Sequence, residues 1–160
     1  ELKSIFKLGT VLFTAADISV DRFLKRLPQI CQMAQQVVVT VSDADNALHS
    51  ARVVMGGDDR IGTSEAIKRE EEFVLDHEIN NFEIIDFSFG KEERGFDITG
   101  HHYWHRHPWA ASDIIFLLRS DLPAKDRGLT YSGMKLIWYL SEEYPRQVRD
   151  AVTKELQGQW

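Results

Sequence analysis

The chain has 160 residues, 43% of them hydrophobic and 28% charged, with a formal net charge of −6. This composition is typical of a globular domain with enough apolar material for a core, and it argues against a disordered chain. The acidic balance argues against nonspecific nucleic-acid binding, and no apolar run approaches the ~20 residues of a membrane span.

The first 36 residues predict a strand and then a helix. Residues 10–16 are a short, continuous apolar run, as expected of a strand buried on both faces. Ser19 is the expected N-cap of a helix with apolar residues at helical spacing, and Pro28 should kink or split that helix. Cys31, the only cysteine, excludes an internal disulfide and is typical of a reducing, cytoplasmic location. We interpret it as a buried hydrophobic residue.

Residues 37–42 are a second apolar run and predict a second strand. A strand, a helix and a strand without a hairpin turn form a βαβ unit, so the two strands should be parallel. Residues 46–55 predict a helix that Gly56 and Gly57 end. The polar, charged residues 58–81 are interpreted as a solvated helix or loop.

The second half of the chain predicts one more convincing strand, at residues 82–87, and then a loop to residue 99. A helix should begin just after Pro108 and run to residue 119, and residues 144–156 predict the last helix. Three parallel strands leave two open edges and cannot cover both faces of every strand. The pattern is therefore that of one end of a larger, doubly wound α/β sheet, and we expect further chain to complete it.

Two stretches carry a resemblance to a known family. Residues 37–48 run from a strand through the acid turn Asp43-Ala44-Asp45-Asn46 into a helix start, and residues 84–88 are followed by Gly100-His101-His102-Tyr103. Together with residues 14–18 and 60–62, they resemble the α/β-hydrolase superfamily. More closely, they resemble bacterial esterase/lipase-like proteins known as domain of unknown function 900. The resemblance covers about residues 6–120. Here Ala16 replaces a proline that is usual in that branch.

The resemblance implies a fold and a reaction. Residues 1–129 would be the C-terminal part of a mostly parallel, doubly wound α/β-hydrolase sheet, and residues 130–160 a helical extension packed on the same domain. The implied reaction is hydrolysis of a small-molecule ester or related acyl substrate, which needs no cofactor. The superfamily's nucleophilic serine lies on a Gly-x-Ser-x-Gly turn, and the 160 residues contain no such turn. We therefore expect the nucleophile on an upstream segment or partner chain.

An aspartate after one strand and a histidine in a later loop are the second and third members of a Ser…Asp…His order. Asp45 is the candidate carboxylate and His101 the candidate base, because the C-terminal ends of parallel strands meet at one sheet edge. Asp43 is the alternative acid. The competing interpretations are that Asp45 only caps a helix and that His101 only packs on Tyr103 or Trp104.

Other functions stay open at this point. Tyr103 and Trp104 could line a cleft for an acyl chain, although aromatic residues at such spacing are more often core. Four histidines lie within seven residues and could bind a metal: His101, His102, His105 and His107. The spacing and the lack of a nearby cysteine count against a metal site. A non-catalytic interaction or regulatory piece with a hydrolase-like fold is the main alternative to an enzyme.

Overall fold

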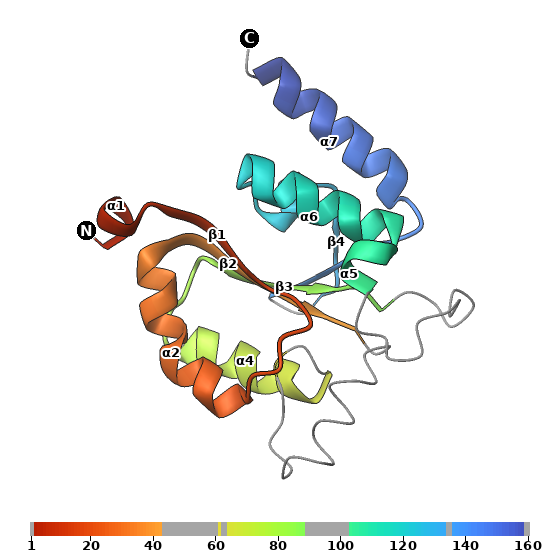
Figure 1. Ribbon diagram of the computed structural model, residues 1–160. Helices are drawn as coiled ribbons and strands as arrows, with labels where there is room; N and C mark the ends of the chain where they lie inside the picture. The colour runs from red at the N-terminus through yellow and green to blue at the C-terminus, as the bar shows by residue number, and fades with distance from the viewer. Residues whose placement is uncertain (1, 43–60, 62–63, 89–102, 134–135, 159–160) are drawn as a thin grey trace.

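The computed structural model describes residues 2–42, 61, 64–88, 103–133 and 136–158. A five-stranded sheet lies between two layers of helices (Figure 1). The strand order is β1-β2-β3-β5-β4, and all neighbours are parallel except the antiparallel pair of β4 and β5. The strands are β1 (Leu8–Phe13), β2 (Ala34–Val41), β3 (Phe82–Asp86), β4 (Thr130–Tyr131) and β5 (Ile137–Tyr139). The predicted α/β class with a mostly parallel sheet is confirmed.

The helices divide between the two faces of that sheet (Figure 1). The bounds are α1 (Leu2–Phe6), α2 (Val20–Met33), α4 (Ser64–Asp76), α5 (Tyr103–Arg106), α6 (Pro108–Ser120), the 3₁₀ turn η2 (Ala124–Asp126) and α7 (Tyr144–Gly158). Helices α2 and α4 cover one face, and α6 covers the other, with α7 beyond it. Within the described residues, no helix is both long and apolar enough to cross a bilayer.

Strand β2 lies inside the sheet, between β1 and β3, and its second half is mostly valine. Val37, Val39 and Val41 point to the α2 and α4 side, whereas Val38 points to the α6 side, and all four are at most 3% exposed. A strand of a parallel sheet that is covered on both faces needs such a continuous run. These four valines thus fix β2 between β1 and β3.

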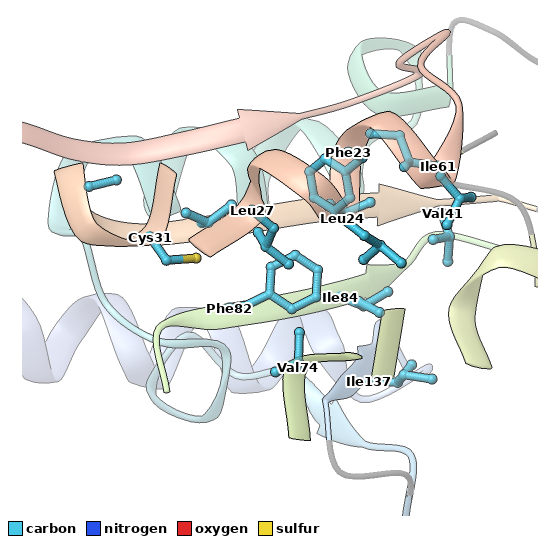
Figure 2. Packing of buried hydrophobic residues seen from close by; sticks show 14 residues of the cluster. Phe23, Leu24, Leu27, Cys31, Val41, Ile61, Val74, Phe82, Ile84 and Ile137 are labelled. Atoms are coloured by element: carbon cyan, nitrogen blue, oxygen red, sulfur yellow. The ribbon is translucent and has the colours of Figure 1, made fainter. Parts of the chain in front are cut away.

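The first core lies between the sheet and helices α2 and α4 (Figure 2). Phe23, Leu24 and Leu27 of α2 pack against Phe82 and Ile84 of β3. The ring of Phe23 meets that of Phe82 with centroids 6.1 Å apart. Cys31 belongs to the same core and is 6% exposed, so its interpretation as a buried hydrophobic residue is confirmed.

The second core lies between the sheet and α6, and it includes the start of α7. Ile114 and Leu117 of α6 pack with Ile85 of β3 and with Tyr144, the first residue of α7. Trp104 and Trp109 pack partly buried against this cluster. Helix α6 begins at Pro108, one residue before the start that the sequence predicted.

The structure differs from the sequence predictions in three places. Helix α2 runs unbroken through Pro28 to Met33, so the predicted split does not occur, and a kink at Pro28 stays a prediction. Residues 64–76 are not simply solvated: α4 buries Glu70 and Val74. The sheet has five strands instead of three, because β4 and β5 have only two and three residues, too few for a periodic signal. The helix predicted over residues 46–55 lies outside the described residues.

Candidate functional site

The C-terminal ends of β2 and β3 lie next to each other at one edge of the sheet. In the parallel register Val41 is opposite Asp86, and the N–H of Phe87 donates to the carbonyl oxygen of Val41 at 2.9 Å. The chain therefore leaves both strands at the same place. Ligands of open α/β sheets bind outside this edge, where the carboxyl ends of the strands meet.

The candidate acid and base lie on the segments that follow these two strands. Asp43, Asp45 and His101 are all outside the described residues, so the structure fixes their flanks and not their side chains. Asp45 comes four residues after Val41, and His101 comes two residues before α5 begins. The pairing of Asp45 with His101 accordingly stays a prediction.

Hydroxyl and carboxylate groups line the described part of this edge. The hydroxyl of Thr40 donates to that of Thr14 at 3.0 Å, which joins the end of β2 to the residue after β1. One carboxylate oxygen of Asp86 accepts from the N–H of Ser88 at 2.7 Å, a side-chain turn that starts the segment leading to His101. Ala15 has a φ of 47°, so the chain turns sharply after β1 through the left-handed region. These contacts hold the chain where it leaves β1, β2 and β3 at this edge.

The aromatic residues after His101 belong partly to the core. Tyr103 is the first residue of α5. Trp104 is half-buried, packs against the second core, and meets the ring of His105 edge-on with centroids 4.6 Å apart. Core packing of Trp104 is therefore observed, and the role of Tyr103 and Trp104 in lining a cleft stays a prediction.

Two of the four clustered histidines are described, and one of them has a structural role. His107 is the N-cap of α6: its Nδ1 accepts from the N–H of Trp109 at 3.3 Å. His105 is exposed. His101 and His102 lie outside the described part of the chain, and within that part no group of three or more metal-ligating side chains is assembled.

A buried charge network is the feature that the sequence did not reveal. Arg127 donates to both carboxylate oxygens of Asp113, at 2.9 and 3.2 Å, and to the carbonyl oxygen of Leu122 at 2.6 Å. Glu83 of β3 lies 3.8 Å from the same guanidinium and accepts from the N–H of Ala124. Fourteen residues separate Asp113 from Arg127, a spacing typical of no motif. Only the fold brings them together.

Burial changes the pKa values of the two carboxylates in this network, and the place of the network in the fold indicates a structural role. Burial raises the pKa of Asp113 and of Glu83, although the Arg127 guanidinium opposes the rise in both. Perturbed carboxylates can mark an active site, but Glu83 is the second residue of β3 and lies toward the N-terminal end of that strand. The network is therefore at the far end of β3 from the edge where the candidate triad residues follow, and it ties β3 to α6 and η2.

The sequence was compared with models of known protein families, and one model matches most of the chain. The family model for alpha/beta hydrolases of unknown function (DUF900) matches residues 2–116. The chain belongs to this family. The match runs from α1 into α6 and so includes both segments that carry the candidate acid and base. No curated protein and no solved structure matches the chain significantly.

Membership supports a hydrolase in general and says nothing of the substrate. The matched residues hold β1, β2 and β3, whereas β4, β5 and α7 come after them. Strand β5 nevertheless pairs with β3 in the parallel register, with Ile84 opposite Ile137. The residues beyond the match thus extend the same sheet.

Proposed function

We propose that this alpha/beta hydrolase supplies the acid and the base of a serine hydrolase that cleaves a small-molecule ester or a related acyl substrate. The observation that carries the proposal is the parallel register of β2 and β3. Because Val41 is opposite Asp86, the acid turn and the histidine segment begin side by side at the C-terminal edge of the sheet. The family match over both segments adds to this geometry.

In the proposed mechanism His101 takes the proton of a serine hydroxyl while the serine oxygen attacks the substrate carbonyl carbon. Asp45 holds the imidazole in the productive tautomer and stabilises the imidazolium. The tetrahedral intermediate then expels the alcohol, which receives the proton from His101 and leaves an acyl-serine. Water, deprotonated by the same imidazole, releases the acid and restores the serine.

The serine comes in this proposal from a segment outside the chain, paired with β1. Two features of β1 favour such a neighbour. Among the described strands β1 pairs only with β2, so its other edge has unpaired backbone groups. Leu8 is 40% exposed, and the remaining residues of β1 are only half-buried. A further parallel strand would cover this edge and bring its own C-terminal end close to the candidate acid and base.

The test compares the chain alone with the chain joined to the segment that carries the serine. Hydrolysis of p-nitrophenyl esters and labelling by a fluorophosphonate should require the joined protein. In the joined protein Asp45→Asn should lower turnover by about 10⁴-fold, as expected when the histidine loses its orienting carboxylate. Asp43→Asn is the matched control two residues away and should lower turnover far less.

Three results would contradict the proposal. Ester turnover by the chain alone, lost in His101→Ala, would place the nucleophile inside these 160 residues. A joined, folded protein that neither turns over esters nor reacts with the fluorophosphonate would favour the non-catalytic alternative. Equal losses from Asp43→Asn and Asp45→Asn would leave the acid unassigned and the pairing with His101 without support.

A further inference from the structure

Asn81, the residue before β3, is hydrogen-bonded to the end of α2 and to the start of β2. Its side-chain Nδ2 donates to the carbonyl oxygens of Cys31 at 3.0 Å, Ala34 at 3.1 Å and Gln35 at 3.2 Å. Its own carbonyl oxygen accepts from the N–H of Val37 at 2.8 Å, where the pairing of β2 with β3 begins. Three carbonyl partners fix the orientation of the amide, because only its nitrogen can donate.

These hydrogen bonds connect a fixed point on a helix to a fixed point on a strand. Cys31 lies in the last turn of α2, where carbonyl oxygens lack a partner within the helix. Ala34 and Gln35 are the first two residues of β2. The Asn81 amide therefore holds the place at which α2 ends and β2 begins, relative to the start of β3.

The valines of β2 do not by themselves specify the register of this strand. A slip of one residue would exchange the two faces of β2 and would bring Thr40, which is 1% exposed, into the apolar first core. A slip of two residues keeps every side chain on its face. Val37, Val39 and Val41 all point into the first core, so such a slip replaces valine by valine. Apolar burial on this face hardly distinguishes the two registers.

Polar contacts do distinguish them. On the α6 side Gln36 donates to Glu83 at 2.8 Å, and Thr40 donates to Thr14 at 3.0 Å. A slip of two residues would break both contacts, but each is a single hydrogen bond. The Asn81 side chain loses three partners in the same slip, and one of them belongs to a helix that cannot follow the strand. Asn81 is therefore the contact that discriminates most strongly between the registers.

We infer that Asn81 sets the register of β2 against β3 and is a positioning residue for the acid and base, an inference that rests on the proposed function. The native register puts Val41 opposite Asp86, so the acid and histidine segments begin side by side. A slip of two residues moves these starting points apart by about 6.6 Å, more than twice the length of a hydrogen bond. The carboxylate of Asp45 would then no longer reach the imidazole of His101.

The first experiment reads the register directly, by NMR scalar couplings across hydrogen bonds in the isotope-labelled chain. In the wild type the N–H of Phe87 should couple to the carbonyl of Val41. Asn81→Asp keeps the size of the side chain but cannot donate to the three carbonyl oxygens. It should shift the ratio of the two registers by on the order of 100-fold and produce a second set of β2 signals, in which Phe87 couples two residues away from Val41. Asn80→Asp, the same change at the exposed neighbouring residue, is the control and should show one set.

Asn81→Ala removes the donors without adding a charge, and it should populate the second register to a smaller extent. If both variants fold in the native register alone, Asn81 does not set the register and the inference is wrong. Loss of folding in both would also overturn it, because the slipped strand keeps its apolar burial and should stay folded.

The second experiment measures p-nitrophenyl ester turnover by the protein joined to the serine-bearing segment. For Asn81→Asp, kcat per folded molecule should fall by the fraction of molecules in the slipped register, with KM unchanged. A general loss of stability would not produce this match. Slipped molecules with full turnover would overturn the positioning role and leave the proposed function intact. A wild-type joined protein without turnover would overturn the proposed function, and the register measurement would still stand.

Discussion

The two faces of the sheet are stabilised in different ways. On the α2 and α4 side the core consists of aliphatic and phenylalanine side chains, packed from both helices onto alternate residues of β2 and β3. On the α6 side the apolar cluster is smaller, and it surrounds the buried pair of Asp113 and Arg127. The first face is held mainly by apolar burial, and the second also by a network with defined geometry.

Each face also buries one carboxylate completely, but only one of the two has a hydrogen-bond partner. Asp113 has a bidentate partner in Arg127. Glu70 on α4 is 0% exposed, and neither of its carboxylate oxygens has a hydrogen-bond partner within the described residues. Burial raises the pKa of Glu70 to about 7. The comparison teaches that a paired buried charge can hold elements together, whereas an unpaired one makes the stability of its face depend on pH.

The largest effect should come from breaking the pair on the α6 side. Arg127→Leu removes the guanidinium and leaves Asp113 buried without its partner, together with the carbonyl oxygen of Leu122. Loss of one member of a buried pair costs about 3–5 kcal/mol. The free energy of unfolding from urea denaturation at neutral pH should fall by that amount.

A double variant distinguishes the stability that the Asp113–Arg127 pair contributes from that of the packing around it. Asp113→Leu/Arg127→Leu removes both charges and should recover most of the stability that Arg127→Leu loses, because no uncompensated charge stays buried. If the double variant is no more stable than Arg127→Leu, the pair does not act as a unit, and the contrast between the two faces is wrong.

Removing the charge of Glu70, the unpaired carboxylate on the α4 side, should raise the free energy of unfolding, whereas Arg127→Leu lowers it. Below pH ~4.5 Glu70 is protonated in both the folded and the unfolded chain and contributes no pH dependence. As the pH rises from 4.5 to about 7, the unfolded chain releases the proton and the folded chain keeps it, so the stability falls by about 3 kcal/mol in total. Glu70→Gln should therefore stabilise the protein at pH 8 and change little near pH 4.5.

The measurement is the free energy of unfolding as a function of pH for the wild type and Glu70→Gln. The same substitution at Glu72, which is exposed on the same helix, serves as the control and should leave the wild-type profile unchanged. If the difference between Glu70→Gln and the wild type does not grow with pH, Glu70 has a partner that compensates its charge.

The features of the first face could largely be predicted from the sequence. The continuous valine run of β2 and the helical spacing of Phe23, Leu27 and Cys31 each carry their own local signal. Parallel pairing then followed from the lack of a hairpin turn. The strands β1, β2 and β3 were predicted for these reasons within a few residues of their observed ends.

The features of the second face could not be predicted in the same way. Strands β4 and β5 are too short for an alternating pattern. Strand β5 forms because β3 offers it an edge, and β4 then pairs with β5. The contact of Asp113 with Arg127 depends on how α6 and η2 pack and on no sequence spacing. For the candidate site, the order of acid turn and histidine segment was visible in the sequence, because strand ends are local features. The pairing of Asp45 with His101 is a long-range contact and stays a prediction.

The smallest of the three effects concerns the contact of α7 with the second face. Gly128 has a φ of +89°, and an added Cβ would lie 2.7 Å from the carbonyl carbon of Gln147 and 2.8 Å from the backbone nitrogen of Val148. Both atoms belong to the backbone of α7, which cannot rotate away as a side chain does. Gly128→Ala should therefore displace α7 and lower the free energy of unfolding by roughly 1–3 kcal/mol.

Gly133 provides a matched control for this prediction. Its φ is +88°, almost equal to that of Gly128, but an added Cβ there meets nothing within 4 Å. Gly133→Ala should thus cost only the backbone strain, about 1 kcal/mol, and the additional loss in Gly128→Ala measures the contact with α7. Equal losses of stability in the two variants would mean that α7 moves aside freely, and the second face would then end at α6.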